Sequence, residues 1–317
     1  MPAIRKTAFH SIERYASSIG RHFVDTISVA PAIAVRAIGN QPTNTGIMTI
    51  AIIAEARMAM DSDEAEAMLN VSKNYPNLIT QIVPAPHTLP YDNTIKNWVA
   101  NEMGDLIFFD VKSTTGEFID YDREIHWREN RDLSGNNIMH MGIFYESAMR
   151  WLGTASSVMA VSNVNVKKRH SSETGHLMDI SIPDHLEAIG EMNIGGNFHL
   201  SHSTVLGGAE KIEINIYGTN STLRISEDPS SKILQSHNTS KLKMEILNIN
   251  SNKWKELKPK KSQIGKWRVE EEFINAIKGK EKISHTTFSD GVKYMQFADA
   301  LKISSESNRK VYLPLSK

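Results

Sequence analysis

The chain has 317 residues, with 36 basic and 36 acidic side chains and no cysteine. The length predicts two domains, and the even charge balance argues against a nucleic-acid or anionic-membrane partner. The lack of cysteine excludes disulfides, thiolate catalysis and cysteine-ligated zinc. No stretch reaches the roughly 18–20 apolar residues of a membrane-spanning helix, so we expect a cytoplasmic protein.

Strand and helix patterns alternate in the first third of the chain. Residues 47–54 form a short apolar run typical of a buried parallel strand, and Asp61 followed by Glu64 resembles a capping box that begins a helix. Residues 78–86 predict a second buried strand closed by two prolines, and residues 92–103 predict a short helix. This alternation favours an α/β domain.

The pattern changes after residue 105, where candidate strands follow one another. Ile212, Ile214 and Ile216 alternate with polar residues, as in an antiparallel sheet with one face in water. The candidate strands are 106–113, 176–182, 188–195, 198–205, 210–218 and 221–226. Two helices are expected near the end, at 269–278 and from a cap at Ser289 to Ser307, followed by a closing strand.

A predicted helix with the sequence SGNNIMHMGIFYESAMRWLG (134–153) contains a histidine. Its larger side chains form two neighbouring stripes, namely Ile138, Met141, Tyr145, Ala148 and Leu152, and His140, Phe144, Ser147 and Trp151. Such a helix is expected between two layers, so His140 is either a hydrogen-bonded core residue or a site residue. Asn136 and Asn137 either cap the helix or mark a terminus that binds an anionic or hydroxylated ligand.

Other histidines give weaker signals. His199 and His202 are three apart on a predicted strand and therefore lie on opposite faces. The sequence places no carboxylate beside them, so no metal site is predicted. Asp179 and Asp184 lie near His185, where they form either a carboxylate–imidazole pair or an ordinary surface cluster.

Four segments, taken in order, resemble the glucose–fructose oxidoreductase / inositol dehydrogenase (Gfo/Idh/MocA) family. They are IIAEARMAM… (52–112), which resembles the Glu-Lys-Pro motif and the crossover after it, IHWREN…WLG (125–153), which resembles the Trp-Arg, Gly-Gly-Gly and D-x-G-x-H motifs, and the segments 182–225 and 271–314. The resemblance implies a Rossmann-like dinucleotide-binding domain over residues 1–104. It also implies an α/β domain with an open, mostly antiparallel sheet over residues 105–317.

The resemblance further implies NAD- or NADP-dependent hydride transfer at a sugar or polyol carbon. The residues that it places at the cofactor are Pro42, Asn44, Glu55, Trp127 and Arg128, and those that it places at the substrate are Asn136, Asn137 and Tyr145. It implies a small-molecule, sugar-like substrate, no metal, and a homo-oligomer that assembles through the C-terminal sheet.

The chain departs from the family pattern where phosphates and protons are handled. No G-x-G-x-x-G occurs near the N-terminus, so we expect a truncated Rossmann-like domain. Ala56 stands at the position of the catalytic lysine, and the neighbouring Arg57 is a poor proton shuttle because a guanidinium stays protonated. His140, Phe144 and Ser147 replace the aspartate, the histidine and the following aspartate of the second-domain helix.

Two functions are consistent with these residues. The first is an NAD(P)-dependent oxidoreductase with a degenerate catalytic motif, in which His140 is the acid–base because imidazole titrates near neutrality and Arg57 orients the substrate. The second is a non-catalytic pseudoenzyme that binds a carbohydrate or another small ligand, or that serves oligomerisation. Binding of NADH or NADPH separates the two.

Overall fold

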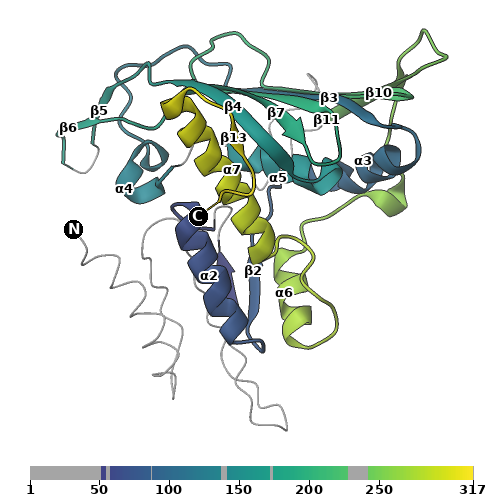
Figure 1. Ribbon diagram of the computed structural model, residues 1–317, viewed down its shortest axis with the longest axis horizontal. Coiled ribbons are helices and arrows are strands. Elements are labelled where there is room, and N and C mark those ends of the chain that lie inside the picture. The colour runs from purple at the N-terminus through teal and green to yellow at the C-terminus, as the bar shows by residue number, and fades with distance from the viewer. Residues whose placement is uncertain are drawn as a thin grey trace.

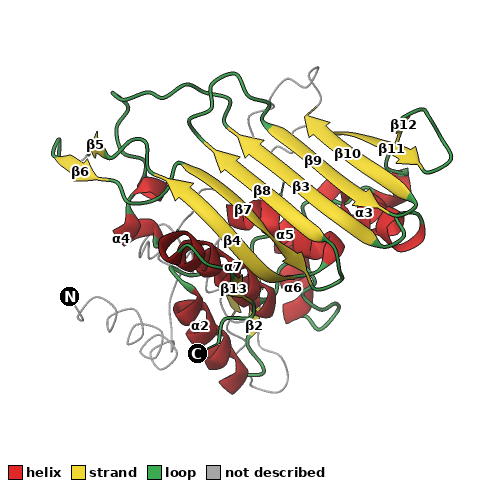
Figure 2. Ribbon diagram, turned by 45° about the horizontal axis from the view of Figure 1, so that its top comes forward, coloured by secondary structure: helices red, strands yellow, loops and turns green. Residues whose placement is uncertain are grey.

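A nine-stranded sheet forms the larger part of the computed structural model (Figure 2). The structure describes residues 51–54, 58–86, 88–136, 141–171, 174–227 and 242–316. In spatial order the strands are β12 (Lys255–Glu256), β11 (Leu242–Asn248), β10 (Ser221–Glu227), β9 (Ile212–Gly218), β3 (Leu106–Thr114), β8 (Asn197–Ser203), β7 (His185–Met192), β4 (Ala155–Asn163) and β13 (Val311–Tyr312). Only β3 and β8 pair in parallel within this sheet, which confirms the expected open, mostly antiparallel arrangement.

The helices α3 (Leu89–Asn101), α5 (Met141–Leu152) and α7 (Phe288–Ser307) lie under one face of the sheet (Figure 1). Alternation along the strands supplies the apolar surface that they cover, since Ile214 and Ile216 are buried while Tyr217 is exposed. Aromatic side chains fill the space between the layers. Phe198 and Phe297 are buried there, with their ring centroids 6.0 Å apart. The core therefore lies between the sheet and this helical layer.

A smaller parallel pair precedes the large sheet. Strands β1 (Ala51–Ala54) and β2 (Ile79–Ile82) pair in parallel, and α2 (Ser62–Asn74) connects them. Half of the predicted capping box is present: Asp61 accepts a hydrogen bond from the Glu64 N–H at 2.9 Å, but the Glu64 carboxylate accepts from the Met60 N–H instead of the Asp61 N–H. Helix α2 packs against α7, which also packs against β4, so α7 joins the parallel pair to the large sheet (Figure 1).

Several predicted boundaries are corrected by backbone chemistry. Strand β2 ends at Ile82, because proline residues follow and cannot donate to a neighbouring strand. Helix α3 begins at Leu89 rather than 92, with Pro90 in the first turn where a missing N–H costs little. Helix α7 is capped by Thr287 rather than Ser289, since the Thr287 hydroxyl accepts from the Asp290 N–H at 3.1 Å.

The remaining elements are short. They are β5 (Lys168–His170) and β6 (Leu177–Asp179), which form a separate two-stranded sheet, η1 (Trp127–Glu129), α4 (Arg131–Ser134), η2 (Lys261–Gln263) and α6 (Val269–Ile277). The strand predicted at 176–182 is thus only three residues long, and β4 was not predicted because small residues hide its alternation. Among the described residues, no helix is both long enough and apolar enough to cross a bilayer.

Candidate functional site

The segment from Trp127 to Asn136 leads into α5 and holds three of the residues that the sequence assigns to the site. The Arg128 guanidinium lies 4.3 Å from the centre of the Trp127 ring, a cation–π contact that fixes both half-buried side chains. His126 is the cap of the short helix η1, and its backbone N–H donates to the Glu129 carboxylate at 2.9 Å. Burial and then the nearby Arg128 charge lower the pKa of His126, which favours its neutral ring.

Gly135 brings this segment into direct contact with the backbone that follows β1. The predicted helix over 134–153 is interrupted here, because Ser134 ends α4 and Gly135 has a φ of +57°. A Cβ on Gly135 would lie 2.2 Å from the Met60 carbonyl oxygen, so only glycine fits. That carbonyl accepts a hydrogen bond from the Asn136 N–H at 3.2 Å.

Asn136 is held at both ends of its side-chain amide. Its Nδ2 donates to Asp299 Oδ1 at 2.8 Å, and its Oδ1 accepts from Arg131 Nη1 at 2.9 Å. The other oxygen of the buried Asp299, Oδ2, accepts from the Ser62 N–H at 2.6 Å. Asn136 therefore positions the entry to α5 against α2 and α7.

The amino-terminal end of α2 is filled by carboxylates. Asp299 accepts from the Ser62 N–H, Asp61 accepts from the Glu64 N–H, and Glu64 accepts from the Met60 N–H at 2.7 Å. A dinucleotide pyrophosphate needs free N–H groups and a positive potential at a helix terminus. At this terminus the Ser62 and Glu64 N–H groups are already occupied by carboxylates, which also make the local potential negative.

The remaining assigned residues fall outside the described part of the chain. They are Pro42, Asn44, Glu55, Arg57, Asn137 and His140. Among the described residues, Trp127, Arg128 and Asn136 are brought together in one segment, and their cofactor and substrate roles stay predictions.

Tyr145 is a core residue in the structure, unlike the substrate contact that the family resemblance implies. Its side chain is 2% exposed and its ring stacks on Phe297 with centroids 3.7 Å apart. Its hydroxyl accepts a hydrogen bond from the Ala155 N–H at 2.8 Å, and burial raises its pKa. Periodicity showed that Tyr145 lies on an apolar stripe but not that Phe297 covers this stripe.

Replacing Tyr145 by phenylalanine tests this placement. We expect the free energy of unfolding to fall by about 1–3 kcal/mol, because the buried Ala155 N–H loses its acceptor. Ligand affinity of the folded protein should not change. Chemical denaturation and a ligand titration of the same sample measure both quantities, and a tenfold loss of affinity at unchanged stability would contradict a core role.

A buried ionic cluster under α5 was missed from the sequence. The Arg150 guanidinium forms ion pairs with Asp92 Oδ2 and Glu146 Oε1, both at 2.8 Å, and all three side chains are at most 9% exposed. Glu146 also accepts hydrogen bonds from the Ala85 N–H at 3.0 Å and from the Thr286 hydroxyl. The spacing of Glu146 and Arg150, four residues apart on an otherwise apolar helix, was the available signal.

Glu146 makes the stability of this cluster depend on pH. Burial raises its pKa more than the Arg150 charge lowers it, so the native state binds a proton that the unfolded state releases above its ordinary pKa of 4.5. Stability contributed by the protonated form is therefore lost as the pH rises from about that value through the raised native pKa. We expect Glu146→Gln to gain stability relative to the wild type over this window. Denaturation midpoints at several pH values measure the difference, and a constant difference would contradict a buried proton.

Two statements about histidines are corrected. His199 does lie beside carboxylates, since Nδ1 is 2.7 Å from Asp110 Oδ1 and Nε2 is 2.8 Å from Glu187 Oε2. His185 pairs with Glu187 at 3.4 Å, whereas Asp184 accepts from backbone N–H groups of the preceding loop. Across the described ranges, no group of three or more such side chains is arranged to hold a metal ion.

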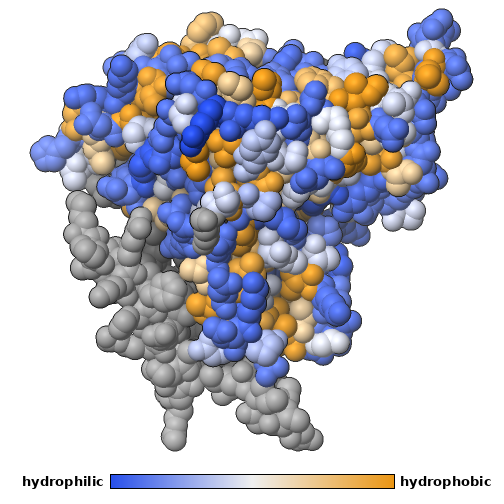
Figure 3. All heavy atoms as spheres, in the orientation of Figure 1, coloured by the Kyte–Doolittle hydropathy of each residue, from blue (hydrophilic) through white to orange (hydrophobic). Residues whose placement is uncertain are grey.

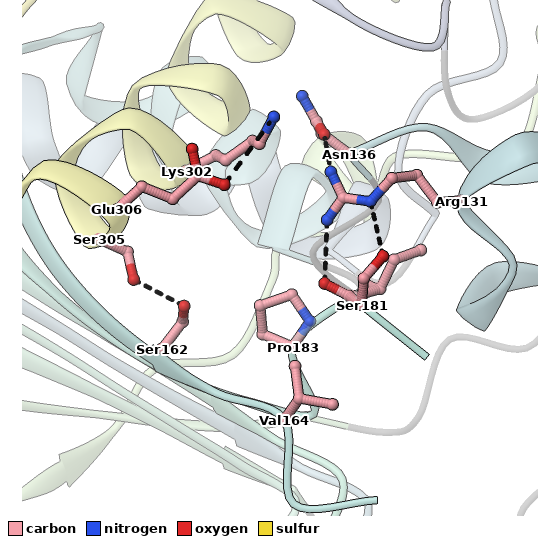
Figure 4. Close-up of a pocket in the computed structure, with 10 residues that line it drawn as sticks. Arg131, Asn136, Ser162, Val164, Ser181, Pro183, Lys302, Ser305 and Glu306 are labelled. Atoms are coloured by element: carbon pink, nitrogen blue, oxygen red, sulfur yellow. Dashed lines mark hydrogen bonds and ion pairs between the residues drawn. The ribbon is translucent and has the colours of Figure 1, made fainter. Parts of the chain in front are cut away.

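A cavity of about 100 Å³ adjoins Asn136 on the side of α7, and its wall combines charged and hydroxylated side chains with apolar ones (Figure 4). Four parts of the chain line it: the segment before α5, the end of β4, the residues after β6, and the last turns of α7. The lining residues are Arg131, Asn136, Ser162, Val164, Ser181, Ile182, Pro183, Lys302, Ser305 and Glu306. The site thus combines a docked segment with a charged cavity behind it.

Comparison with known proteins places this arrangement among oxidoreductase folds. Residues 96–313 match the family described as "Oxidoreductase family, C-terminal alpha/beta domain" (GFO_IDH_MocA_C), whereas no curated protein sequence matches. An NAD-binding oxidoreductase from Klebsiella pneumoniae superposes with a TM-score of 0.67 at 15% identity, covering 84% of this chain and 74% of that chain.

Two further solved structures share the fold. Levoglucosan dehydrogenase in complex with NADH and L-sorbose has a TM-score of 0.68 at 16% identity, covering 84% of this chain and 74% of that chain. The transcriptional regulator Gal80p from Kluyveromyces lactis has a TM-score of 0.64 at 18% identity, covering 83% and 69%. At these identities the likeness shows the architecture alone.

Proposed function

The chain belongs to the Gfo/Idh/MocA oxidoreductase family, and we propose that it binds a sugar or a similar polyhydroxylated compound at the amino-terminal end of α5. The observation that carries this proposal is the docking of Gly135 and Asn136 onto Met60, which holds the entry to α5 beside the residues that follow β1. Structures of the similar levoglucosan dehydrogenase contain L-sorbose or levoglucosan, which supports a saccharide as the ligand class.

Binding without hydride transfer is the form of this function that the residues favour. Ala56 stands where the family resemblance implies the catalytic lysine, and the alanine side chain has no ionisable group that could transfer a proton. Tyr145, which the resemblance implies at the substrate, is committed to the core. The similar fold of Gal80p, a transcriptional regulator by its title, shows that this architecture is not restricted to proteins named as dehydrogenases.

An NAD(P)-dependent oxidoreductase with a degenerate motif is the second candidate. Two observations favour it: similar structures contain NADH, and His140 is a titratable side chain at a motif position of the family. In this alternative the His140 imidazole takes the proton of the substrate hydroxyl. Of the cofactor residues that the resemblance implies, Pro42, Asn44 and Glu55 lie outside the described part of the chain, and Trp127 and Arg128 lie within it.

Titration of NADH and NADPH, followed by a screen of sugars, separates these functions. We expect sugars to raise the melting temperature of the purified protein by mass action, while neither dinucleotide changes the melting temperature or the tryptophan fluorescence. Saturable dinucleotide binding together with sugar-dependent reduction of NAD or NADP would establish the oxidoreductase instead. His140→Ala should abolish such turnover, with the exposed His176→Ala as the matched control. No response to any sugar would overturn the proposal.

We also propose that the open face of the sheet binds a second copy of the chain. Apolar side chains gather where β4, β7 and β13 meet, with Met159, Val161, Ile189 and Tyr312 between 45% and 67% exposed. Figure 3 shows apolar spheres along the upper edge of the molecule, where Figure 1 places the sheet. Both charge signs lie beside this patch, since Lys310 pairs with Glu191 at 2.8 Å next to Tyr312, so the face is suited to a two-fold contact with itself.

Light scattering across a concentration series tests this assembly. We expect a dimer or larger oligomer that Ile189→Asp dissociates, because the variant buries a charge in the interface. Ile274→Asp changes an equally apolar side chain on α6, away from the sheet, and should leave the mass unchanged. A wild-type monomer at every concentration would refute self-association.

A further inference from the structure

The cavity beside Asn136 is walled by charged and hydroxylated side chains from elements far apart in the sequence. Helix α7 contributes Lys302, Ser305 and Glu306 on one side, and Arg131 with Asn136 lies on the other (Figure 4). The Ser162 and Ser305 hydroxyls are 2.6 Å apart at the junction of β4 and α7. The wall of the cavity is therefore formed in part by the packed elements β4 and α7 and not by a loop alone.

The charge of the lining is positive. Arg131 and Lys302 are cationic, and Glu306 is the single carboxylate among the lining residues. Glu306 neutralises Lys302 only weakly, since their closest nitrogen–oxygen distance is 3.9 Å and 65% of the Glu306 side chain is exposed. The side chains that line the cavity therefore sum to one positive charge, and the Asp299 carboxylate lies behind the lining, on the far side of the Asn136 amide.

Arg131 is fixed in place and still has N–H groups to offer. Its Nε and Nη2 donate to the Ser181 hydroxyl and carbonyl, at 2.8 and 2.9 Å, and its Nη1 donates to Asn136. These contacts use three of the five guanidinium N–H groups, so one remains on each terminal nitrogen. Each of these two N–H groups can donate to an oxygen of a carboxylate or a phosphate.

The size of the cavity limits what can enter. A volume of about 100 Å³ exceeds that of one water molecule, which occupies about 30 Å³ of the liquid, but it does not hold a nucleotide. A carboxylate or phosphate group, with hydroxyls facing the serines, satisfies both the size and the charge.

We propose that this cavity is an oxyanion subsite, in which Arg131 and Lys302 bind the carboxylate or phosphate of a small hydroxylated ligand. The subsite does not require a neutral sugar to bind at α5, so it stands or falls separately from the proposed function. A ligand that reaches both places would be a sugar acid or a sugar phosphate. A free anion would occupy the cavity alone.

Thermal melting at constant ionic strength, with the full chain, tests the subsite. The probes are inorganic phosphate and D-gluconate, with uncharged D-glucose for comparison. We expect both anions to raise the melting temperature saturably, with Lys302→Gln weakening both by about tenfold or more, because a charge-assisted contact is lost. Lys293→Gln, a lysine of the same helix outside the cavity, should bind as the wild type does.

A gain of affinity provides the second readout. Glu306→Gln removes the single carboxylate of the lining, so we expect it to bind phosphate several-fold more tightly than the wild type, a result that misfolding cannot produce. Tighter binding of gluconate than of phosphate identifies the sugar acid as the source of the oxyanion, and the reverse identifies phosphate. Equal affinities of Lys302→Gln and the wild type, or no saturable effect of either anion, would overturn the proposal.

Discussion

Replacing Arg150 by methionine is expected to lower the free energy of unfolding by about 3–5 kcal/mol. Arg150 is the cation between two buried carboxylates, Asp92 and Glu146, and its Nη2 also donates to the Thr88 hydroxyl at 2.8 Å. Methionine fills a similar volume but, at a pH above the raised pKa of Glu146, leaves both carboxylates without a counter-charge. Because this cluster ties α3 and α5 together, the loss should spread to the whole sheet–helix layer. Chemical denaturation measures it.

Arg224→Met is the matched control for that substitution. Arg224 pairs with Glu245 at 2.8 Å and covers the Trp254 ring on the open face, where 41% of its side chain is exposed. A surface ion pair of this kind contributes about 0–1 kcal/mol. If both variants lost the same free energy of unfolding, burial of the Arg150 ion pairs would contribute nothing, and the expected role of Arg150 would be contradicted.

Gly135→Ala is expected to destabilise the protein by about 2–5 kcal/mol and to weaken ligand binding at α5. The substitution combines a left-handed backbone, at φ +57°, with a Cβ that would meet the Met60 carbonyl oxygen at 2.2 Å. The segment must move away from Met60, which breaks the hydrogen bond from the Asn136 N–H. Urea denaturation and a sugar titration of the folded fraction measure the two effects.

Gly175→Ala is the control that separates the cost of a positive φ from the cost of a Cβ in contact with Met60. Gly175 has a similar φ of +68°, but a Cβ there would have no neighbour within 4 Å. We expect the free energy of unfolding of this variant to fall by only about 1–2 kcal/mol, the cost of the positive φ alone. Its ligand affinity should equal that of the wild type. If both alanine variants behaved alike, the close approach to Met60 would not matter for the site.

Local chemistry made part of the fold predictable. The cap between Asp61 and Glu64 uses residues three apart, and the burial of Ile214 and Ile216 follows from strand alternation alone. These features need no knowledge of distant contacts. Strand β4 escaped prediction because serines and alanines give its sequence, ASSVMAVSN, little contrast between its two faces.

The site was harder to predict because its contacts are tertiary. Periodicity placed Tyr145 on an apolar stripe but could not show that Phe297 stacks on it. The sequence around His199 contains no carboxylate at a useful spacing, yet sheet pairing brings Asp110 and Glu187 to its ring. The family resemblance, and not the periodicity, indicated that the segment containing Asn136 belongs to the site.

The bridge from α7 to α2 has a consequence for how the protein is made. Asp299 holds the Ser62 N–H, and Tyr294 accepts from the Met58 N–H at 2.8 Å. These partners are 237 and 236 residues apart, so at about 5–20 residues per second a ribosome needs roughly 10–50 s between making one and making the other. During that interval α2 exists without the helix that receives it. The nascent chain must therefore wait, with this surface uncovered, until translation is almost complete.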